Sequence, residues 1–453
     1  MNRLILIFLL FFAFGVHAQE SHEMTLQQCI DYALQNHASV KNAALDVNSA
    51  DARVGEVRSV GLPQLSGTVE IADNPQLRRM FLSGDNPMLG TMMPTPPPPG
   101  EVVGVENLFQ LRASGDAGGT LSQLLFDGSY FVGLKAATVY RELAQKSLTQ
   151  TKIETIDAVT KAYYMVLINQ ERTGLLDNNL ARLDTLLRET RAMYQEGFAE
   201  EVDVSRIEVN YNNLLVDKQR FENMEKISRL MLKFQMGMPM DDDISLLQSL
   251  DDFEGQISSE RLPVNYEDRI EYSLLQTNHR LYNLDVRNEQ AASLPRLSAF
   301  ATGGYMTQHT SIPNLFSNEW YFYSMYGLRL NIPIFDGLGR MYRVRQAKYN
   351  VAKVENDIKN LENSIELQTR EARMTLDNNL KLLEAKRRNL RLAQEVTRVT
   401  RIKYQEGVGS NLEVTTAEND LRQAQTNYYN ALFDVLTADV DYRKALGTLN
   451  ENE

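Results

Sequence analysis

The sequence predicts an α+β membrane protein built from a helix–strand–strand–helix unit that occurs twice. Three observations support this: duplicated motifs, long stretches without proline, and segments in which apolar and polar residues alternate. Phe126-Asp127-Gly128 returns as Phe335-Asp336-Gly337 at an offset of 209 residues, and Tyr194-Gln195-Glu196-Gly197 returns as Tyr404-Gln405-Glu406-Gly407 at an offset of 210. Self-similarity over so long a unit indicates an internal duplication.

The 453-residue chain begins with a segment that has the pattern of an export signal. Arg3 supplies a positive charge, residues 4–14 form an apolar core, and Val16-His17-Ala18 provides a small-residue cleavage site. A buried N-terminal helix or an anchor is the alternative, but the apolar run is short for a bilayer span. We therefore expect residues 1–18 to be a signal peptide, with no transmembrane helix after it.

The composition argues against several classes of function. Cys29 is the only cysteine, so no intrachain disulfide forms, and we expect it to be a small apolar residue on a helix face. A net charge of −12 without a basic cluster argues against nucleic acid as a partner. The sequence has no His-Glu-x-x-His motif, paired cysteines or glycine-rich phosphate loop. We expect no enzyme activity, cofactor or metal site.

The sequence of the first copy of the unit, residues 19–239, predicts a helix, a strand hairpin and two more helices. Residues 25–60 have helical spacing. The hairpin, about 62–126, alternates over residues 63–71 and again from about residue 111, and the proline-rich residues 94–100 between them suit neither helix nor central strand. Long helices are expected over about 129–194 and 201–236.

An acidic linker, residues 240–263, leads to the second copy, residues 264–453. A helix from about residue 266 ends at Leu294-Pro295, which matches Leu62-Pro63 at an offset of 232. Because the offset falls from 232 to 209, the second hairpin, about 294–335, is 23 residues shorter and lacks the proline-rich segment. Insertions are tolerated best at loop tips, so the scaffold should be unchanged.

The long helix after Phe335-Asp336-Gly337 carries a heptad seam. Its apolar residues recur at alternating steps of three and four: Val344, Ala347, Val351, Val354, Ile358, Leu361 and Ile365. This pattern predicts helices packed side by side with a left-handed supercoil. Sixty-odd residues give a rod of roughly 90–100 Å, which indicates a helix that spans a gap.

Four amphipathic strands bracketed by such rods need something to cover their apolar faces. Strands of about ten residues with alternating faces and aromatics near one end are typical of membrane β-barrels, which have at least about eight strands. Several chains must therefore pool their strands, and three would give twelve. We expect Trp320, Phe322 and Tyr326, on one face of the last strand, to form a membrane aromatic belt. The alternative is a soluble hairpin on a helical bundle, with these aromatics as a core patch.

These features together resemble the outer membrane efflux proteins of the TolC type over essentially the whole mature length. The resemblance rests on the leader, the duplicated unit, the Phe-Asp-Gly turns and these further motifs: Leu62-Pro63-Gln64-Leu65-Ser66, Leu294-Pro295-Arg296-Leu297-Ser298, and the Tyr-x-x-Gly turns followed by Asp203-Val204 and Glu413-Val414. It implies a homotrimer whose twelve-stranded outer-membrane β-barrel is continuous with a long α-helical periplasmic barrel.

The same resemblance implies a function and partners. Such proteins are the passive exit duct of a tripartite efflux or type I secretion system. The expected partners are a periplasmic adaptor (membrane fusion) protein, an inner-membrane efflux pump or ABC transporter, and outer-membrane lipid. A periplasmic coiled-coil adaptor or structural rod is the alternative. An exported enzyme would need a clustered polar site that the sequence does not show.

The resemblance also places the Tyr-x-x-Gly turns at the periplasmic mouth, where the adaptor docks. The expected docking residues are Tyr194, Gly197, Tyr404, Gly407, Gly409 and Ser410. Gly197 and Gly407 also suit a helix-terminating residue with positive φ. Gly409 lacks a side chain, which permits close backbone contact with a partner.

The pore constriction of the family is only partly present. The resemblance implies two acidic residues three apart after the second turn, where this chain has Glu413 and Thr416, while the first copy has Asp203 and Arg206. A ring of Glu413 side chains would still create a negative field at a narrow pore. Alternatively, Glu413 is a solvated acid favoured by the dipole at the start of its helix.

Overall fold

The computed structural model describes residues 22–107, 109–255 and 263–449, and the expected signal peptide lies outside them. The chain divides into two compact units. The first comprises the chain up to Ser49, Glu142–Asn278 and the chain from Lys353 onward, and the second comprises Ala50–Arg141 and His279–Ala352. Each unit draws on both copies of the repeat, so the duplication does not correspond to two separate compact units.

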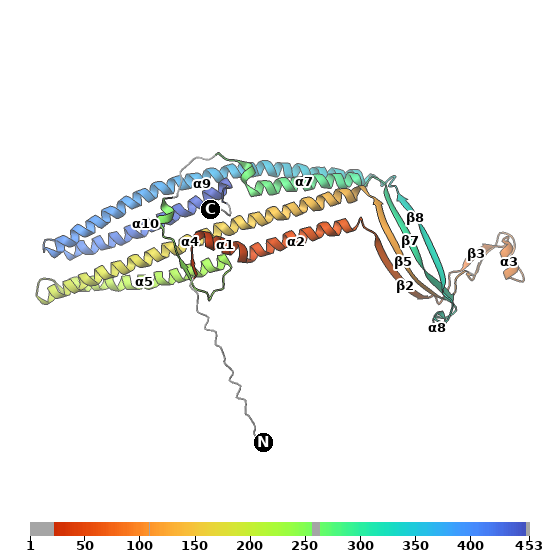
Figure 1. Ribbon diagram of the computed structural model, residues 1–453, viewed down its shortest axis with the longest axis horizontal. Coiled ribbons are helices and arrows are strands. Elements are labelled where there is room, and N and C mark those ends of the chain that lie inside the picture. The colour runs from red at the N-terminus through yellow and green to blue at the C-terminus, as the bar shows by residue number, and fades with distance from the viewer. Residues whose placement is uncertain (1–21, 108, 256–262, 450–453) are drawn as a thin grey trace, which may run out of the picture. The chain divides into compact units, whose positions relative to one another are not determined.

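Four long helices form two helical hairpins (Figure 1). The first hairpin is α4 (Gly128–Gln195) with α5 (Glu201–Met236), and the second is α9 (Gly339–Gln405) with α10 (Asn411–Leu446). These bounds confirm the helices predicted over about 129–194 and 201–236. The seven residues of the predicted heptad seam are buried or half-buried on α9, which confirms the seam.

Apolar side chains in the first unit form two clusters. The larger one surrounds Tyr163 and Cys29 and includes side chains of α4, α10, α1 (Leu26–Asn36) and α6 (Asp251–Glu254). Beside it, β1 (His22–Met24) pairs in parallel with β6 (Ile244–Leu246), so the linker contributes a strand. Burial raises the pKa of the Cys29 thiol to about 12, which makes it the inert apolar residue that was expected.

The helix predicted over residues 25–60 is in fact two helices, α1 and α2 (Ala38–Ser59), because the backbone at His37 is extended. An equivalent break at Arg269, 232 residues later, separates the 3-10 helix η1 (Tyr266–Asp268) from α7 (Ile270–Ala291). At each break the glycine that ends the last helix of the repeat approaches the backbone: Gly237 approaches His37, and Gly447 approaches Asp268. We attribute both breaks to this tertiary contact, because it recurs at the same place in both copies.

The second unit contains a four-stranded antiparallel sheet in the order β2–β5–β7–β8 (Figure 1). Its strands are β2 (Gln64–Asp73), β5 (Ala113–Phe126), β7 (Arg296–His309) and β8 (Tyr321–Asn331). The predicted alternation holds across the sheet. One face carries Leu65, Val69, Phe322, Tyr326 and Leu328, and the other carries Thr68, Asp116, Thr120, Thr302 and Tyr323.

The apolar face of this sheet is open to solvent in the single chain. Leu65 is 79% exposed, Val69 76% and Tyr326 87%. On the polar face, the Thr120 and Thr302 hydroxyls are 3.1 Å apart, and the Tyr323 hydroxyl donates to Asp116 at 3.2 Å. These polar side chains are thus paired within the chain, whereas the apolar side chains named above are uncovered.

The two strand hairpins differ at their tips, as the shorter offset predicted. Between β2 and β5 lie β3 (Met80–Ser83), α3 (Pro87–Met92) and β4 (Val102–Val105), while residues 94–100 form neither helix nor strand. Between β7 and β8 lies only α8 (Ile312–Leu315). In the part of the chain that the structure describes, every helix is too short or too polar to cross a membrane.

Candidate functional site

The two helix turns predicted as the working site have nearly the same backbone. Gly197 has φ +83° and Gly407 φ +75°, and both lie where an added Cβ would meet nothing within 4 Å. The Gly197 N–H donates to the carbonyl of Tyr194 at 3.0 Å, and the Gly407 N–H donates to that of Tyr404 at 3.1 Å. The positive φ alone therefore requires glycine at these positions, as predicted.

Gly409 makes a close contact within its own chain. A Cβ at this position would lie 3.0 Å from both Cβ of Lys403 and the backbone nitrogen of Tyr404. This glycine thus permits the turn to pack closely against the C-terminal end of the preceding helix, α9. Ser410 caps α10, since its hydroxyl oxygen accepts from the Glu413 N–H at 3.3 Å. A bulky residue at 409 would disturb the turn itself, so it is a poor probe of docking.

The two tyrosines of the duplicated motif have different surroundings. Tyr404 is 8% exposed, and its hydroxyl lies 2.9 Å from the Thr190 hydroxyl, which links α9 to α4. Tyr194, at the equivalent position 210 residues earlier, is 43% exposed. The sequence motif is the same, but only one tyrosine is enclosed within the chain.

Asn411 joins the two turns and was not identified from the sequence. Its side-chain amide donates to the Asp203 carbonyl oxygen at 3.0 Å, and its Oδ1 accepts from the Thr415 hydroxyl at 3.1 Å. Asn411 is only 5% exposed. Its partner is 208 positions away, so no local pattern indicates this bond.

The four candidate pore residues lie in the first two turns of α5 and α10. Asp203 is half-buried, and its carboxylate accepts from the Glu200 N–H at 3.4 Å, which helps to cap α5. Glu413, Thr416 and Arg206 are exposed, and the Thr416 hydroxyl donates to the Leu412 carbonyl at 2.8 Å. Asp203 thus has a structural role at its helix end, whereas the Glu413 carboxylate faces solvent.

Each turn also presents a pair of exposed apolar side chains that the sequence analysis did not single out. Phe198 is 85% exposed and Val202 53%, and their counterparts 210 residues later, Val408 and Leu412, are 78% and 57% exposed. The sequence could have indicated these residues, because apolar residues stand at equivalent positions of two otherwise polar turns. Exposed apolar groups of this kind mark interaction surfaces.

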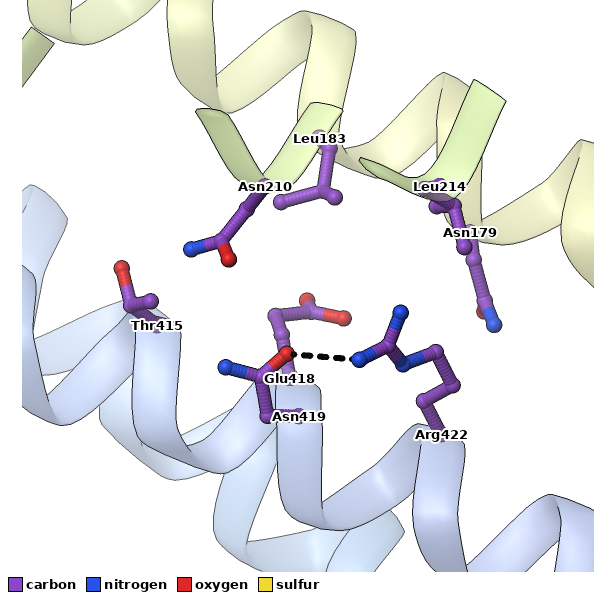
Figure 2. Close-up of a pocket in the computed structure, with 8 residues that line it drawn as sticks. All are labelled: Asn179, Leu183, Asn210, Leu214, Thr415, Glu418, Asn419 and Arg422. Carbon is purple, nitrogen blue, oxygen red and sulfur yellow. Dashed lines mark hydrogen bonds between the residues drawn. The ribbon is translucent and has the colours of Figure 1, made fainter. Parts of the chain in front are cut away.

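A polar pocket lies among α4, α5 and α10, further from the turns (Figure 2). Figure 2 shows Thr415, Glu418, Asn419 and Arg422 of α10 facing these side chains of α4 and α5: Asn179, Leu183, Asn210 and Leu214. Arg422 donates to Asn419 at 3.4 Å and pairs with Asp217 of α5 at 3.1 Å. At this pocket the two hairpins are joined by the polar pair of Arg422 and Asp217, while elsewhere α4 and α10 share the larger apolar cluster.

A family model described as outer membrane efflux protein matches residues 29–214 and 274–448, most of both copies of the repeat. The chain belongs to the outer membrane efflux protein family. It is 24% identical over 347 residues to outer membrane protein TolC of Vibrio cholerae, which covers 74% of this chain and 77% of that protein. It is 24% identical over 440 residues to the probable efflux pump outer membrane protein TtgC of Pseudomonas putida, which covers 94% and 83%.

Among solved structures, the open state of the MtrE outer membrane channel of Neisseria gonorrhoeae has a TM-score of 0.71 at 18% identity, covering 94% of this chain and 90% of that one. The fold is thus that of the outer membrane channels of this family. Membership assigns the protein to the outer membrane and favours a channel over the periplasmic rod and the soluble hairpin that the sequence left open.

Proposed function

We propose that this outer membrane efflux protein is the exit duct of a tripartite efflux or type I secretion system. Three copies pool four strands each into a twelve-stranded barrel, and their helical hairpins form a periplasmic tunnel. The observation that carries the proposal is the uncovered apolar face of the β2–β5–β7–β8 sheet. Contact of such an apolar face with lipid carries no free-energy cost, whereas its exposure to water is unfavourable.

The edges of the sheet support closure with other copies. The edge strands β2 and β8 each pair with a single strand among the described residues. Open sheet edges are not stable in lipid, so each edge needs a partner. Because the four strands alternate in direction, β8 of one copy would run antiparallel to β2 of the next. Two copies would give an eight-stranded barrel, and side chains fill the interior of a barrel of that size. The wider twelve-stranded barrel therefore suits a duct.

The aromatic residues near the start of β8 suit the membrane boundary. Trp320 packs against Gly115, and Phe322 lies 5.4 Å from Tyr305, centroid to centroid, on the same apolar face. Tyr326 is six residues from Trp320, a distance of about 20 Å along a strand. We therefore assign the aromatic belt to Trp320, Phe322 and Tyr305, with Tyr326 facing the lipid acyl chains.

The helix turns form the periplasmic mouth in this proposal. The adaptor docks on the turns that carry Tyr194, Gly197, Gly407, Gly409 and Ser410, with Phe198 and Val408 as apolar anchors. Tyr404 is enclosed within the chain, so it positions its turn and does not contact the adaptor. The pump at the inner membrane supplies substrate and energy, and the duct conducts passively. Glu413 gives the mouth a negative field, to which the half-buried Asp203 adds less; Thr416 and Arg206 supply no further acid.

The test combines mass and conductance. We expect the detergent-purified protein to have the native mass of three chains and to conduct ions in planar bilayers. Leu65→Arg with Val69→Arg should block membrane assembly, because charge on the lipid face costs about 2–4 kcal/mol per residue. The matched control, Thr68→Arg on the opposite face, should assemble. A non-conducting periplasmic monomer would refute the proposal.

A further inference from the structure

The charges on the polar face of the β2–β5–β7–β8 sheet are separated by sign. With histidine counted as neutral, the four strands contain five charged residues, and Asp73 at the end of β2 pairs with Arg112 at 2.8 Å. The other four are Glu70, Asp116, Arg296 and Arg329. Side chains alternate along a strand, and an even spacing from the threonines of the polar face or their strand partners places all four on that face.

The two arginines lie at the end of the sheet that leads to the helices. Arg296 is the first residue of β7, and Arg329 is the third from the end of β8. Arg296 is opposite Asn331 and Arg329 is opposite Ser298, so the arginines are diagonal neighbours, which lie about 7–8 Å apart on one face of a sheet. Together with Ser298, Asn331 and Ser122 they line a hollow of about 480 Å³.

Little of this positive charge is neutralised within the chain. Among the described residues, no carboxylate lies within ion-pair distance of Arg329, whose guanidinium lies 5.1 Å from the centroid of the Phe300 ring. Arg296 reaches the Asp127 carboxylate at 3.5 Å, and that carboxylate also caps α4 by accepting from the Ser129 N–H at 2.8 Å. Both arginines are exposed, so their N–H donors remain open to a ligand.

The two acidic residues lie at the opposite end of the same face. Glu70 is directly opposite Asp116, which is opposite Met306. Met306 is ten residues from Arg296 along β7, a distance of about 33 Å on a strand. The polar face is therefore positive near the helices and negative near the hairpin tips.

This separation by sign follows the two copies of the repeat. Arg296 corresponds to Gln64 at the offset of 232, and Arg329 corresponds to Thr120 at the offset of 209. The counterparts of the acidic residues are also neutral: Thr302 for Glu70 and Met325 for Asp116. Each copy forms the same strands with neutral residues where the other carries charge, so the strands themselves do not require these charges.

We propose that Arg296 and Arg329 form an oxyanion-binding pair inside the barrel, near its junction with the helices, which takes carboxylate or phosphate groups of substrates in transit. This inference rests on the proposed function, in which the polar face lines the lumen. Three copies place three such pairs at one level of the lumen. Each guanidinium presents a planar fork of N–H donors that matches an oxyanion, and converging like charges raise the local concentration of the opposite ion.

The pair differs in sign and in place from the acid at the helix turns. Glu413 lies in the first turn of α10 and would favour cations at the mouth. Arg296 and Arg329 lie on the sheet and would favour anions there. Selectivity of the duct is then set at two levels, and a substrate with both charges finds a partner for each.

Block by a multivalent anion tests the pair. Inorganic pyrophosphate is added to single channels in planar bilayers at about 0.1 M salt, where screening is limited to about 10 Å. It should reduce the conductance of the wild type, and Arg296→Gln with Arg329→Gln should raise the half-blocking concentration about tenfold, because the donor forks are lost. The matched control, Glu70→Gln with Asp116→Asn, removes as many charges from the same face and should still be blocked.

A second variant covers a failure of the double variant to assemble, which native mass reveals. Arg329→Gln alone leaves no carboxylate without a partner and should still weaken the block about threefold. If the wild type is trimeric and conducting but pyrophosphate does not block it, or blocks the arginine variants at the same concentration, the inference is wrong while the proposed function stands. If the wild type neither trimerises nor conducts, the proposed function fails, and this inference fails with it.

Discussion

The two copies of the repeat share a skeleton but differ in what surrounds their ends. At the turns, Tyr404 is enclosed against Thr190, while Tyr194 is exposed. The last helices match in length and end alike, so the backbone does not explain the difference. The second turn meets α4 of the first hairpin within the chain, whereas Tyr194 has its equivalent face open. A duplicated motif therefore preserves conformation, and its neighbours decide burial.

The opposite ends of the repeats show the same contrast. At the break before α7, the Arg269 guanidinium donates to the Ala445 carbonyl at 2.8 Å and pairs with Glu271 at 3.1 Å. At the equivalent break before α2, His37 is half-buried, and no hydrogen-bond partner of its Nδ1 is found among the described residues. The second copy thus stabilises its break with an ion pair and a hydrogen bond of Arg269, and the described residues show no equivalent of these contacts at His37.

The largest expected effect comes from truncating the enclosed tyrosine. Tyr404→Ala should lower the free energy of unfolding of the unassembled chain by about 3 kcal/mol, because it leaves a cavity among buried side chains. Tyr194→Ala should cost less than about 1 kcal/mol under the same conditions. Denaturant unfolding followed by circular dichroism measures both. Equal costs would contradict the difference between the two turns.

The next largest effect is on the free energy of unfolding, at the helix breaks before α7 and before α2. Arg269→Met should cost about 2 kcal/mol, because it removes charge-assisted hydrogen bonds and leaves the Ala445 carbonyl without this donor. His37→Ala should cost clearly less. Thermal unfolding of the two variants, measured side by side, compares the breaks directly. The comparison fails if the histidine variant is the less stable one.

A smaller effect is expected at the apolar residues of the turns. Phe198→Ser with Val408→Ser should weaken adaptor binding about tenfold, equivalent to about 1.4 kcal/mol. Glu196→Ala with Glu406→Ala changes the same turns without removing apolar surface and serves as the control. Binding of purified adaptor and drug susceptibility of cells report the effect. Unchanged binding in the serine variant would remove these residues from the docking surface.

The acidic residues of the two turns should also differ. Glu413→Gln should reduce the cation preference of the channel about twofold, roughly 0.4 kcal/mol, because its carboxylate is exposed at the mouth. Asp203→Asn should change selectivity less, since that side chain caps α5. Single-channel reversal potentials in a salt gradient measure both. An unchanged record for the Glu413 variant leaves only the helix-end role for this residue.

The smallest effect is a pH dependence at the second break. Burial opposes the charge of Glu271, but its hydrogen bonds with Arg269 and the backbone prevail and lower its pKa. Its contribution to stability is therefore present above the unfolded pKa of about 4.3 and is lost as the pH falls through the folded pKa. Glu271→Gln should lower the melting temperature at pH 6 and have less effect near pH 3. A difference that does not vary with pH would contradict this.

The sequence alone was sufficient wherever the signal is local. The absence of proline and the heptad spacing set the extents of α4 and α9, and alternation set the faces of β2 and β8. Gly197 and Gly407 were identifiable because positive φ is a property of single residues. The family followed from the order of these motifs.

Only the tertiary structure determined how distant segments use these local features. The helix over residues 25–60 breaks at His37, where Gly237, 200 residues later, approaches the backbone. Asn411 joins the turns through Asp203, and Thr190 encloses Tyr404 but not Tyr194. Local sequence fixes backbone conformation through short-range sterics and hydrogen bonds, whereas burial depends on which segments meet in space. A duplicated chain can therefore repeat its motifs and still place their side chains in different surroundings.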